Sequence, residues 1–430
     1  MYIFSNYHLN LSHLLFKFTI LFFQNKEYYR TKYIDKIENL WSDSKNYLTV
    51  CYSCRSAFDL LLNSLHFEPG SEIIFTALTI RNMVNFAEYY GLKVLPWDID
   101  ISTTYPKLDQ LERLLSPQTR VVVITHLFGI KIPNEIMSLI VNKIRAYNSN
   151  IIIVEDLAQC FYELKDNKHQ QTDVALYSFG TSKTFTAIKG GVLETNNCKL
   201  NLKIKEKLQQ FPVISRSQTF KDLLTTSLGL FLSLPLIMGI TSQILKWIGS
   251  DFETFIKKYF TAYPTKLNKE GKEDFEQIVR KVRFQPSIAT LALLTKRLEN
   301  LSSSIDQPLQ DKQKRGRYAC KLLKQIPEVI VPGGQIENRN YWIFSVYFVS
   351  PNSNLFRLKE KLVQSGFGVS FTATTFGCVD QFVTDKTSSR YISPREAVSY
   401  INNVLYLPII SNIPENKIQE MVHIIQQHVH

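Results

Sequence analysis

Two short stretches decide the fold: residues 151–160 read IIIVEDLAQC, and residues 177–185 read YSFGTSKTF. The first is an apolar run that ends in acidic residues. The second is a strand-like run followed by small and hydroxyl residues and then a lysine. Apolar runs of this length are typical of strands buried in a parallel sheet, where polar residues at the carboxyl ends of strands build the site. We therefore expect Asp156 and Lys183 at one edge of an α/β sheet.

These two residue types suit one kind of chemistry. A carboxylate at a strand end can pair with a protonated ring nitrogen and keep it charged. A lysine presented by a tight polar turn can have a lowered pKa and form a Schiff base with a carbonyl compound. Taken alone, Asp156 is as readily a helix cap, and Lys183 is more readily a solvated loop lysine. Together, and followed by Gly190 and Gly191 before another strand, they indicate a catalytic site.

A third stretch, residues 53–58 (SCRSAF), opens a helical pattern with small and polar residues. The first turn of a helix has free backbone N–H groups and a partial positive charge, which together bind phosphate. An ordinary helix cap is the simpler interpretation of this stretch alone. Beside the other two stretches, it is a candidate phosphate site.

Helical and strand patterns alternate from about residue 49 to residue 194, which predicts an α/β domain with a mainly parallel sheet. A smaller α+β domain is expected at the C-terminal end. We divide the chain into an N-terminal helical segment (1–48), a large α/β domain (49–199), an atypical apolar and basic insertion (200–283) and the small domain (284–430). Strands are expected at 72–75, 93–97, 120–125, 151–155, 174–179, 191–195, 341–349 and 404–407.

The composition of the chain limits the classes of binding partner and the cellular compartment that we expect. With 430 residues, the chain suits a large domain plus a smaller one. A net charge of +12 is compatible with nucleic acid, an anionic membrane or phosphorylated small molecules, but no RNA-binding signature or zinc-finger spacing favours nucleic acid. Six cysteines in a chain of this length predict a reducing cytoplasm. Cys51 and Cys54 form a C-x-x-C without a second pair, so we expect no metal and treat a redox role as a minor alternative.

Two apolar stretches of the chain are candidates for contact with a membrane. Lys17 interrupts the first, at the N-terminus, and no small-residue cleavage site follows, so we expect an amphipathic helix or leader rather than a signal peptide. The second, residues 223–245, is uncharged and long enough to span a bilayer, but Pro235 divides it. We expect one or two helices there. A buried helical pair is slightly favoured over peripheral membrane contact, for which Lys221 and Lys246 would supply flanking charge.

The three polar stretches together resemble the DegT/DnrJ/StrS family of pyridoxal-phosphate-dependent sugar aminotransferases, which have the aspartate-aminotransferase-like fold (fold type I). The resemblance covers the chain from about Asn25, except roughly residues 200–280. EDLAQ (155–159) and SFGTSK (178–183) carry it most specifically, and THLFG (125–129) and LYLPI (405–409) support it.

The resemblance implies a role for each matching residue. Lys183 would hold pyridoxal phosphate covalently and move a proton between substrate carbon and cofactor, while Asp156 would pair with the pyridine nitrogen. Gln159 would lie near the phenolic oxygen. The phosphate would be held by Ser178, Ser53 and the backbone at Cys54 and Arg55. His126 is expected to be structural, and Arg283 stands about where the family has an asparagine that reaches the neighbouring subunit's phosphate.

The implied activity is the transfer of an amino group, with glutamate as the expected donor, to a nucleotide-linked keto-sugar in surface polysaccharide or glycoconjugate biosynthesis, by a homodimer. The chain departs from the family at Cys54-Arg55, where Gly-Thr is usual, at Lys189, where glutamate is usual, and at Ile80, near the usual ring-stacking aromatic. Two alternatives stay open. One is a sugar dehydratase or eliminase, although the family's dehydratases replace the lysine with histidine. The other is a degenerate, non-catalytic relative.

Overall fold

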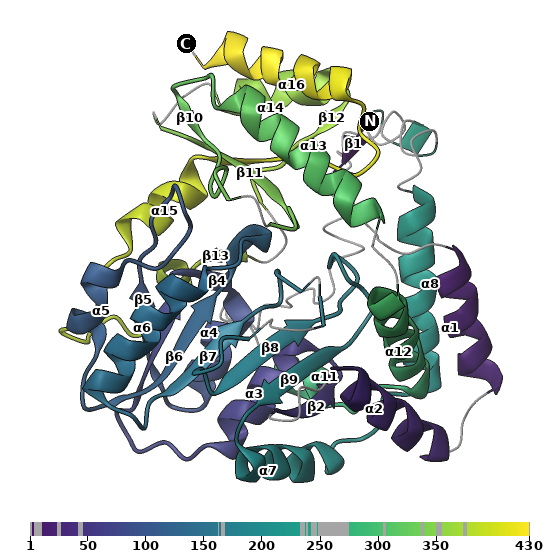
Figure 1. Ribbon diagram of the computed structural model, residues 1–430, viewed down its shortest axis with the longest axis vertical. Helices are drawn as coiled ribbons and strands as arrows, with labels where there is room; N and C mark the ends of the chain where they lie inside the picture. Colours follow the sequence, from purple (N-terminus) through teal and green to yellow (C-terminus); the bar gives the residue numbers. More distant parts are fainter. Residues whose placement is uncertain are drawn as a thin grey trace.

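The computed structural model has a large central sheet of seven strands, five of them neighbouring and parallel (Figure 1). The strand β9 is antiparallel to both of its neighbours. The order is β2 (Tyr47–Cys51), β9 (Gly191–Thr195), β8 (Val174–Ser178), β7 (Ile152–Asp156), β6 (Thr119–Thr125), β3 (Glu72–Thr76) and β5 (Lys93–Trp97). The predicted, mainly parallel sheet is confirmed, and its strands lie within a residue of the expected ranges apart from β2, which the patterns did not single out.

The described part of the chain has several gaps. It comprises residues 2–3, 11–23, 27–41, 46–161, 163–164, 168–232, 237, 240–241, 247, 275–303, 307–336, 339–349, 355–372 and 376–429. Residues 248–274 of the predicted insertion, and most of its apolar stretch after residue 232, therefore lie outside the described residues. Among the described helices, none has the length and apolar character needed to cross a bilayer.

Side chains alternate along the strands and bury both faces of the sheet. Ile73 and Phe75 face one core, whereas Ile74 faces another. The first core is covered by α3 (Cys54–Ser64), α4 (Arg81–Tyr89), α7 (Cys198–Gln209) and α11 (Phe275–Val282). The second is covered by α5 (Leu108–Leu114) and α6 (Asn134–Tyr147), and a third, next to it, by α2 (Glu27–Trp41) and α12 (Ile288–Ser303). Double-sided burial explains why these strands are apolar throughout.

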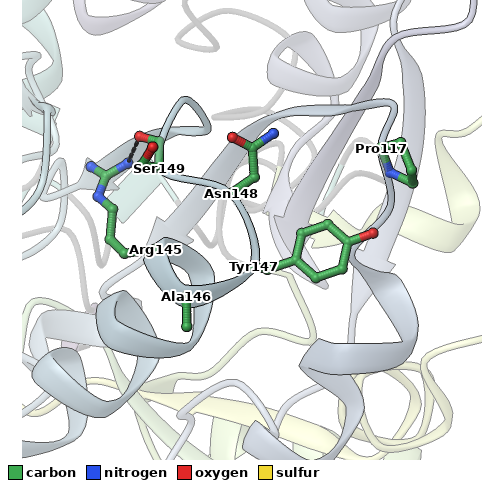
Figure 2. A pocket seen from close by; sticks show the side chains of 6 residues that line it. All are labelled: Pro117, Arg145, Ala146, Tyr147, Asn148 and Ser149. Carbon is green, nitrogen blue, oxygen red and sulfur yellow. Dashed lines mark hydrogen bonds between the residues drawn. The ribbon is translucent and has the colours of Figure 1, made fainter.

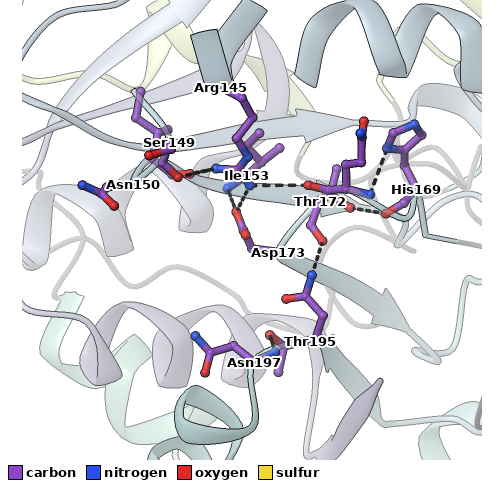
Figure 3. Close-up of polar contacts among 12 residues, drawn as sticks. Arg145, Ser149, Asn150, Ile153, His169, Thr172, Asp173, Thr195 and Asn197 are labelled. Atoms are coloured by element: carbon purple, nitrogen blue, oxygen red, sulfur yellow. Dashed lines mark hydrogen bonds and ion pairs between the residues drawn. The ribbon is translucent and has the colours of Figure 1, made fainter. Parts of the chain in front are cut away.

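The starting ends of β7 and β8 are fixed by one ion pair (Figure 3). Arg145 Nη2 donates to Asp173 Oδ2 at 2.7 Å, and the same oxygen accepts from Ile153 N at 2.7 Å. Arg145 Nη1 also donates to Ile151 O at 2.6 Å. These contacts set the register of the two strands, and therefore the relative positions of the residues at their carboxyl ends.

The C-terminal part forms a second, antiparallel sheet with its own core. Its strands are β10 (Val329–Ile330), β11 (Phe344–Phe348) and β14 (Val404–Leu407), covered by α13 (Gln307–Leu323), α14 (Leu355–Gln364) and α16 (Glu415–His428). This agrees with the expected α+β character. It is joined to the large sheet region through β13 (Phe376–Cys378), which pairs with β4 (Leu78–Ile80). At the N-terminal end, β1 (Tyr2–Ile3) pairs with β12 (Phe367–Gly368). The exact domain limits remain a prediction.

The N-terminal segment is helical, with α1 (Leu11–Phe23) packed on α12 and on α8 (Arg216–Leu232). Lys17, which interrupts the apolar pattern of α1, is buried. Its Nζ donates to Ala187 O and to Thr290 Oγ1, each at 3.1 Å. Burial lowers the pKa of Lys17 to about 7, and the attraction of Asp222 only partly opposes this. The single charge in this apolar helix therefore has an internal function: it ties α1 to the loop after β8.

Candidate active site

Lys183 is presented by a closed turn between β8 and β9. Lys183 N donates to Gly180 O at 3.0 Å. The base of the loop is closed where Phe179 N donates to Gly190 O and Ala187 N donates to Phe179 O, both at 2.9 Å. The turn therefore holds the lysine at the edge where the parallel strands end, as the sequence predicts.

The surroundings of the lysine amine lower its basicity. Although Lys183 is partly exposed, burial of its amine lowers the pKa to about 8, against the opposing attraction of Asp156. Arg55 also lowers this pKa by repulsion. An amine with this pKa has a far larger neutral fraction near physiological pH than an ordinary lysine, although most of it is still protonated, and only the neutral amine is a nucleophile.

Asp156 is the last residue of β7 and is 7% exposed. Its Oδ1 accepts a hydrogen bond from Ala158 N at 3.0 Å, so it caps the following turn as well as facing the lysine. Burial raises the pKa of Asp156, while that backbone hydrogen bond and the charge of Lys183 lower it. The carboxylate is thus placed in a water-poor site where a cation is its natural partner.

The neighbouring acid, Glu155, has a structural function. His126 Nδ1 accepts from Ile132 N at 3.0 Å, which leaves Nε2 as the donor to Glu155 Oε2, also at 3.0 Å. His169 N donates to Glu155 Oε1 at 2.7 Å. Burial alone would raise the pKa of Glu155, but its hydrogen bonds from His126, Thr172 and His169 outweigh burial and lower that pKa. The buried contacts of His126 support its expected structural role.

The start of α3 lies beside the lysine loop. Ser53 is the cap of this helix, and its Oγ accepts from Ser56 N at 3.1 Å. Ser53 forms a bridge with Gly190, and a Cβ on Gly191 would lie 2.4 Å from Cys54 N. Glycine at this position therefore lets β9 approach the first turn of α3. By helix geometry, the backbone N–H groups of the first turn of α3, which includes Cys54 and Arg55, point out of the N-terminal end of the helix.

Ser178, at the end of β8, pairs with Gly191 in the sheet. It therefore lies at the same edge as the start of α3. The structure thus brings together Lys183, Asp156, Ser178 and residues 53–55, which are six of the eight residues predicted for the site.

Gln159 and Arg283 are already engaged elsewhere in the chain. Gln159 Oε1 accepts from Phe128 N at 2.7 Å, which fixes the turn after β6. Arg283 forms a two-pronged ion pair with the fully buried Asp59 of α3: Nε donates to Oδ2 at 2.9 Å and Nη2 to Oδ1 at 3.0 Å. Tyr90 Oη also donates to Asp59, at 2.7 Å. Within a single chain, the guanidinium of Arg283 therefore binds the carboxylate of Asp59. Its binding to the phosphate in a second subunit stays a prediction.

A segment from the C-terminal part completes the site, and the sequence patterns did not identify it. The Trp342 ring centre lies 4.0 Å from Lys183 Nζ, and its Nε1 donates to Ser182 O at 2.7 Å. Asn340 Nδ2 donates to Gln159 O, and Asn340 N donates to Gly129 O, both at 3.0 Å. Residues 340–342 therefore contact three motifs: SFGTSK through Ser182, EDLAQ through Gln159 and THLFG through Gly129. The sequence offered no signal for it, since Trp342 lies within an ordinary strand pattern.

Gly129 explains one of the supporting motifs. Its φ is +81°, and a Cβ would lie 1.7 Å from Asn340 Oδ1. Only glycine tolerates both the backbone conformation and this approach. The glycine of THLFG is therefore the contact point between the C-terminal segment and the large sheet.

A surface hollow of about 520 Å³ lies elsewhere (Figure 2). It is lined by Pro117, Arg145, Ala146, Tyr147, Asn148 and Ser149. These residues precede β6 and β7, so they lie at the opposite edge of the sheet from Lys183. The hollow is therefore not part of the candidate active site.

Comparisons with known proteins agree with this geometry. Residues 25–230 match the model of the DegT/DnrJ/EryC1/StrS aminotransferase family. Similar curated proteins include GDP-perosamine synthase of Escherichia coli O157:H7, 29% identical over 170 residues, which are 38% of this chain and 45% of that protein. Another is the spore coat polysaccharide biosynthesis protein SpsC of Bacillus subtilis (strain 168), 27% identical over 155 residues, 36% of this chain and 39% of that protein. The chain thus matches less than half the length of these relatives.

Solved structures match along almost the whole chain. PseC of Helicobacter pylori, an aminotransferase involved in the biosynthesis of pseudoaminic acid, has a TM-score of 0.68 at 13% identity, covering 100% of this chain and 99% of that one. The E. coli GDP-4-keto-6-deoxy-D-mannose-3-dehydratase, solved with bound hydrated PLP, has a TM-score of 0.67 at 17% identity, with 99% of both chains covered. These likenesses confirm the expected fold. Over residues 25–230, this chain thus resembles the DegT/DnrJ/EryC1/StrS aminotransferase family.

Proposed function

We propose that the protein is a pyridoxal-phosphate-dependent aminotransferase that moves an amino group, supplied by glutamate, to a nucleotide-linked keto-sugar for a polysaccharide or another glycoconjugate. The observation that carries this proposal is the lysine amine with a pKa of about 8 beside the buried carboxylate of Asp156. The family match and the names of the relatives support the reaction and the substrate class.

The described residues fit pyridoxal phosphate. Lys183 would bind its aldehyde carbon, Asp156 would pair with its ring nitrogen, and the first turn of α3 with Ser178 would hold its phosphate. Bound there, the cofactor supplies an electron sink for the bond broken at the substrate carbon. Gly191 has no side chain, so β9 can approach the backbone of Cys54 closely. This close approach makes the phosphate end of the site compact.

The chain's own residues would then perform three tasks. The Lys183 amine would move a proton between the nitrogen-bearing carbon of the substrate and the cofactor carbon that Lys183 itself releases, for which a pKa near neutrality is well suited. Asp156 keeps the ring nitrogen protonated through its charge. Trp342 holds the Lys183 turn through Ser182 and covers the amine, which limits the access of water.

Dehydration is a less favoured reaction, although one solved structural relative is a dehydratase. Lys183 supplies the amine that amino transfer requires, and the intact pair with Asp156 also opposes a non-catalytic role. The deciding experiment is to incubate the purified protein with ¹⁵N-labelled glutamate and a panel of nucleotide-linked keto-sugars. Label in the sugar product supports the proposal. Loss of water from the sugar without label would favour dehydration, and neither reaction with any sugar would favour the non-catalytic alternative.

The pH dependence of cofactor capture tests the lowered pKa of Lys183. We expect the rate of reconstitution of cofactor-free protein to rise with pH and level off above about pH 8, because the neutral amine is the reacting form. An unperturbed lysine would still gain reactivity up to about pH 10.4. Stopped-flow absorbance with the aldehyde form of the cofactor measures this rate. A profile that keeps rising through pH 10 would contradict the assignment.

A cytoplasmic homodimer with shared sites is also part of the proposal. If Arg283 of one subunit serves the phosphate of the other, mixing Lys183→Ala and Arg283→Ala chains restores part of the activity, because one hybrid site keeps both groups. For this role, Arg283 must break its ion pair with Asp59, so the shared site requires a rearrangement of this side chain. A monomer by light scattering, or no restored activity in proven mixed dimers, would refute the shared site.

A further inference from the structure

Helix α8 exposes a continuous apolar stripe. Leu224, Leu228 and Phe231 are 53%, 50% and 54% exposed, and their spacing places them on one side of the helix. The opposite side is buried, with Leu223 fully inaccessible and packed in the core beneath the lysine loop. The helix therefore has apolar residues on both sides, which water-facing helices of globular proteins usually avoid.

Helix α1 widens this stripe into a surface. Figure 1 shows α1 and α8 beside each other at the right-hand edge of the molecule, and the two helices are in contact. On α1, Leu15 and Phe22 are 56% and 61% exposed. Phe22 meets Phe220 of α8 edge-on, with ring centres 6.3 Å apart. We call this surface the α1–α8 face, and it comprises Leu15, Phe22, Phe220, Leu224, Leu228 and Phe231.

The hydroxyl groups of Thr225, Thr226 and Ser227 on α8 form their hydrogen bonds within the helix. Thr225 Oγ1 donates to Lys221 O at 2.8 Å, Thr226 Oγ1 to Asp222 O at 2.8 Å and Ser227 Oγ to Leu223 O at 2.9 Å. Hydroxyl groups closed onto the preceding turn are tolerated in an apolar medium. The sole acid of α8, Asp222, accepts from Gln218 Nε2 at 3.0 Å and lies 3.9 Å from Lys189 Nζ. Thus no unpaired acid of this helix opposes contact with lipid.

The charges next to the α1–α8 face are positive. Arg216 and Lys221 are exposed on the first turns of α8, and the whole chain carries a net charge of +12. Directly after Asp222, the sequence has no charged residue until Lys246. An apolar stripe beside cations is the arrangement that binds the surface of an anionic bilayer.

We propose that the α1–α8 face docks on an anionic membrane, with α8 lying along the surface and its Leu and Phe side chains in the boundary between headgroups and acyl chains. The proposed contact is peripheral, with α8 lying on the surface, and none of the described helices is long and apolar enough to cross a bilayer. The catalytic edge of the sheet is then held near a membrane through Lys17 and Lys189, which link α1 and α8 to the lysine loop. This proposal does not depend on the reaction that the site catalyses.

Flotation of the purified full chain with vesicles tests the proposal. We expect the protein to float with vesicles that contain phosphatidylglycerol, more strongly at low salt, and to stay largely behind with pure phosphatidylcholine whatever the salt concentration. Leu224→Ser/Leu228→Ser/Phe231→Ser should lower the partition coefficient roughly a hundredfold. Arg216→Gln/Lys221→Gln should lower binding roughly tenfold, and only to the anionic vesicles.

A matched control exists on other surfaces of the protein. Leu139, Leu202 and Phe356 are 53%, 54% and 62% exposed, and they lie on α6, α7 and α14. Their triple serine variant should float like the wild type. Both triple variants should keep the thermal stability of the wild type, because the replaced side chains are exposed.

Three results would overturn the proposal. The first is a wild-type protein that stays soluble with anionic vesicles at low salt. The second is a Leu224→Ser/Leu228→Ser/Phe231→Ser variant that floats normally but changes its oligomeric state, since the face would then bind a second copy. The third is a variant that floats normally but unfolds at a much lower temperature, since another part of this chain would then cover the face.

Discussion

Lys183→Ala is expected to lower amino transfer by roughly 10⁴-fold or more, because it removes both the nucleophile that binds the cofactor and the base that moves the proton. The folded protein should persist, since the side chain is partly exposed and contributes little core volume. Steady-state assay with labelled glutamate measures the loss of activity, and thermal unfolding checks the fold.

Chemical trapping gives an independent measure of the same assignment. Borohydride reduction of the cofactor-loaded wild type should fix the cofactor on the single peptide that contains Lys183, and the Lys183→Ala chain should show no such adduct. Lys189, six residues away in the same loop, is the natural control, because its Nζ is directed toward Asp222. A reduced adduct on Lys189 or another lysine would contradict the role of Lys183.

Asp156→Asn is expected to lower turnover by roughly 10²- to 10³-fold, since it removes the charge that keeps the ring nitrogen protonated. An asparagine oxygen can still accept the hydrogen bond from Ala158 N, so the turn should remain. The absorption spectrum and the affinity for the cofactor should change together with the rate.

Glu155→Gln is the matched control for that experiment. Glu155 faces His126, His169 and Thr172 rather than the lysine, so its replacement should mainly lower stability. An Asp156→Asn protein with the wild-type rate, or a Glu155→Gln protein with a changed spectrum but unchanged stability, would reverse the two assignments.

The sequence predicts the large sheet well because its strands are buried on both faces and are apolar throughout. It also predicts that Asp156 and Lys183 lie at the edge of the sheet where β7 and β8 end, and the structure has both residues there. It does not reveal which of two adjacent acids faces the site. That choice depends on strand alternation, and His126 and Thr172, which occupy the other face, bind Glu155 instead.

Sequence patterns could not predict the contacts between segments that lie far apart in the chain. Trp342 lies 160 residues from Ser182, and only the folded chain brings its ring over the Lys183 amine. Arg283 is a second example. The family resemblance placed it where a phosphate ligand for the neighbouring subunit is expected, but within the chain its partner is the buried carboxylate of Asp59. The apolar character of residues 223–232 was visible in the sequence, whereas its division into a buried and an exposed side required the neighbouring helices.

The buried Lys17 makes the docking of α1 a proton-linked equilibrium. With a pKa of about 7 in the folded protein and an ordinary value of 10.5, Lys17 is protonated in both the folded and the unfolded state below pH 7. Between pH 7 and 10.5, the unfolded chain binds a proton that the folded chain does not, so the stability that depends on this burial rises with pH and is lost as the pH falls toward 7. Because Lys17 donates to Ala187 O, the loop that carries Lys183 is part of this equilibrium. Each docking of the N-terminal helix onto the catalytic loop therefore releases a proton to solvent in alkaline conditions and none in acid.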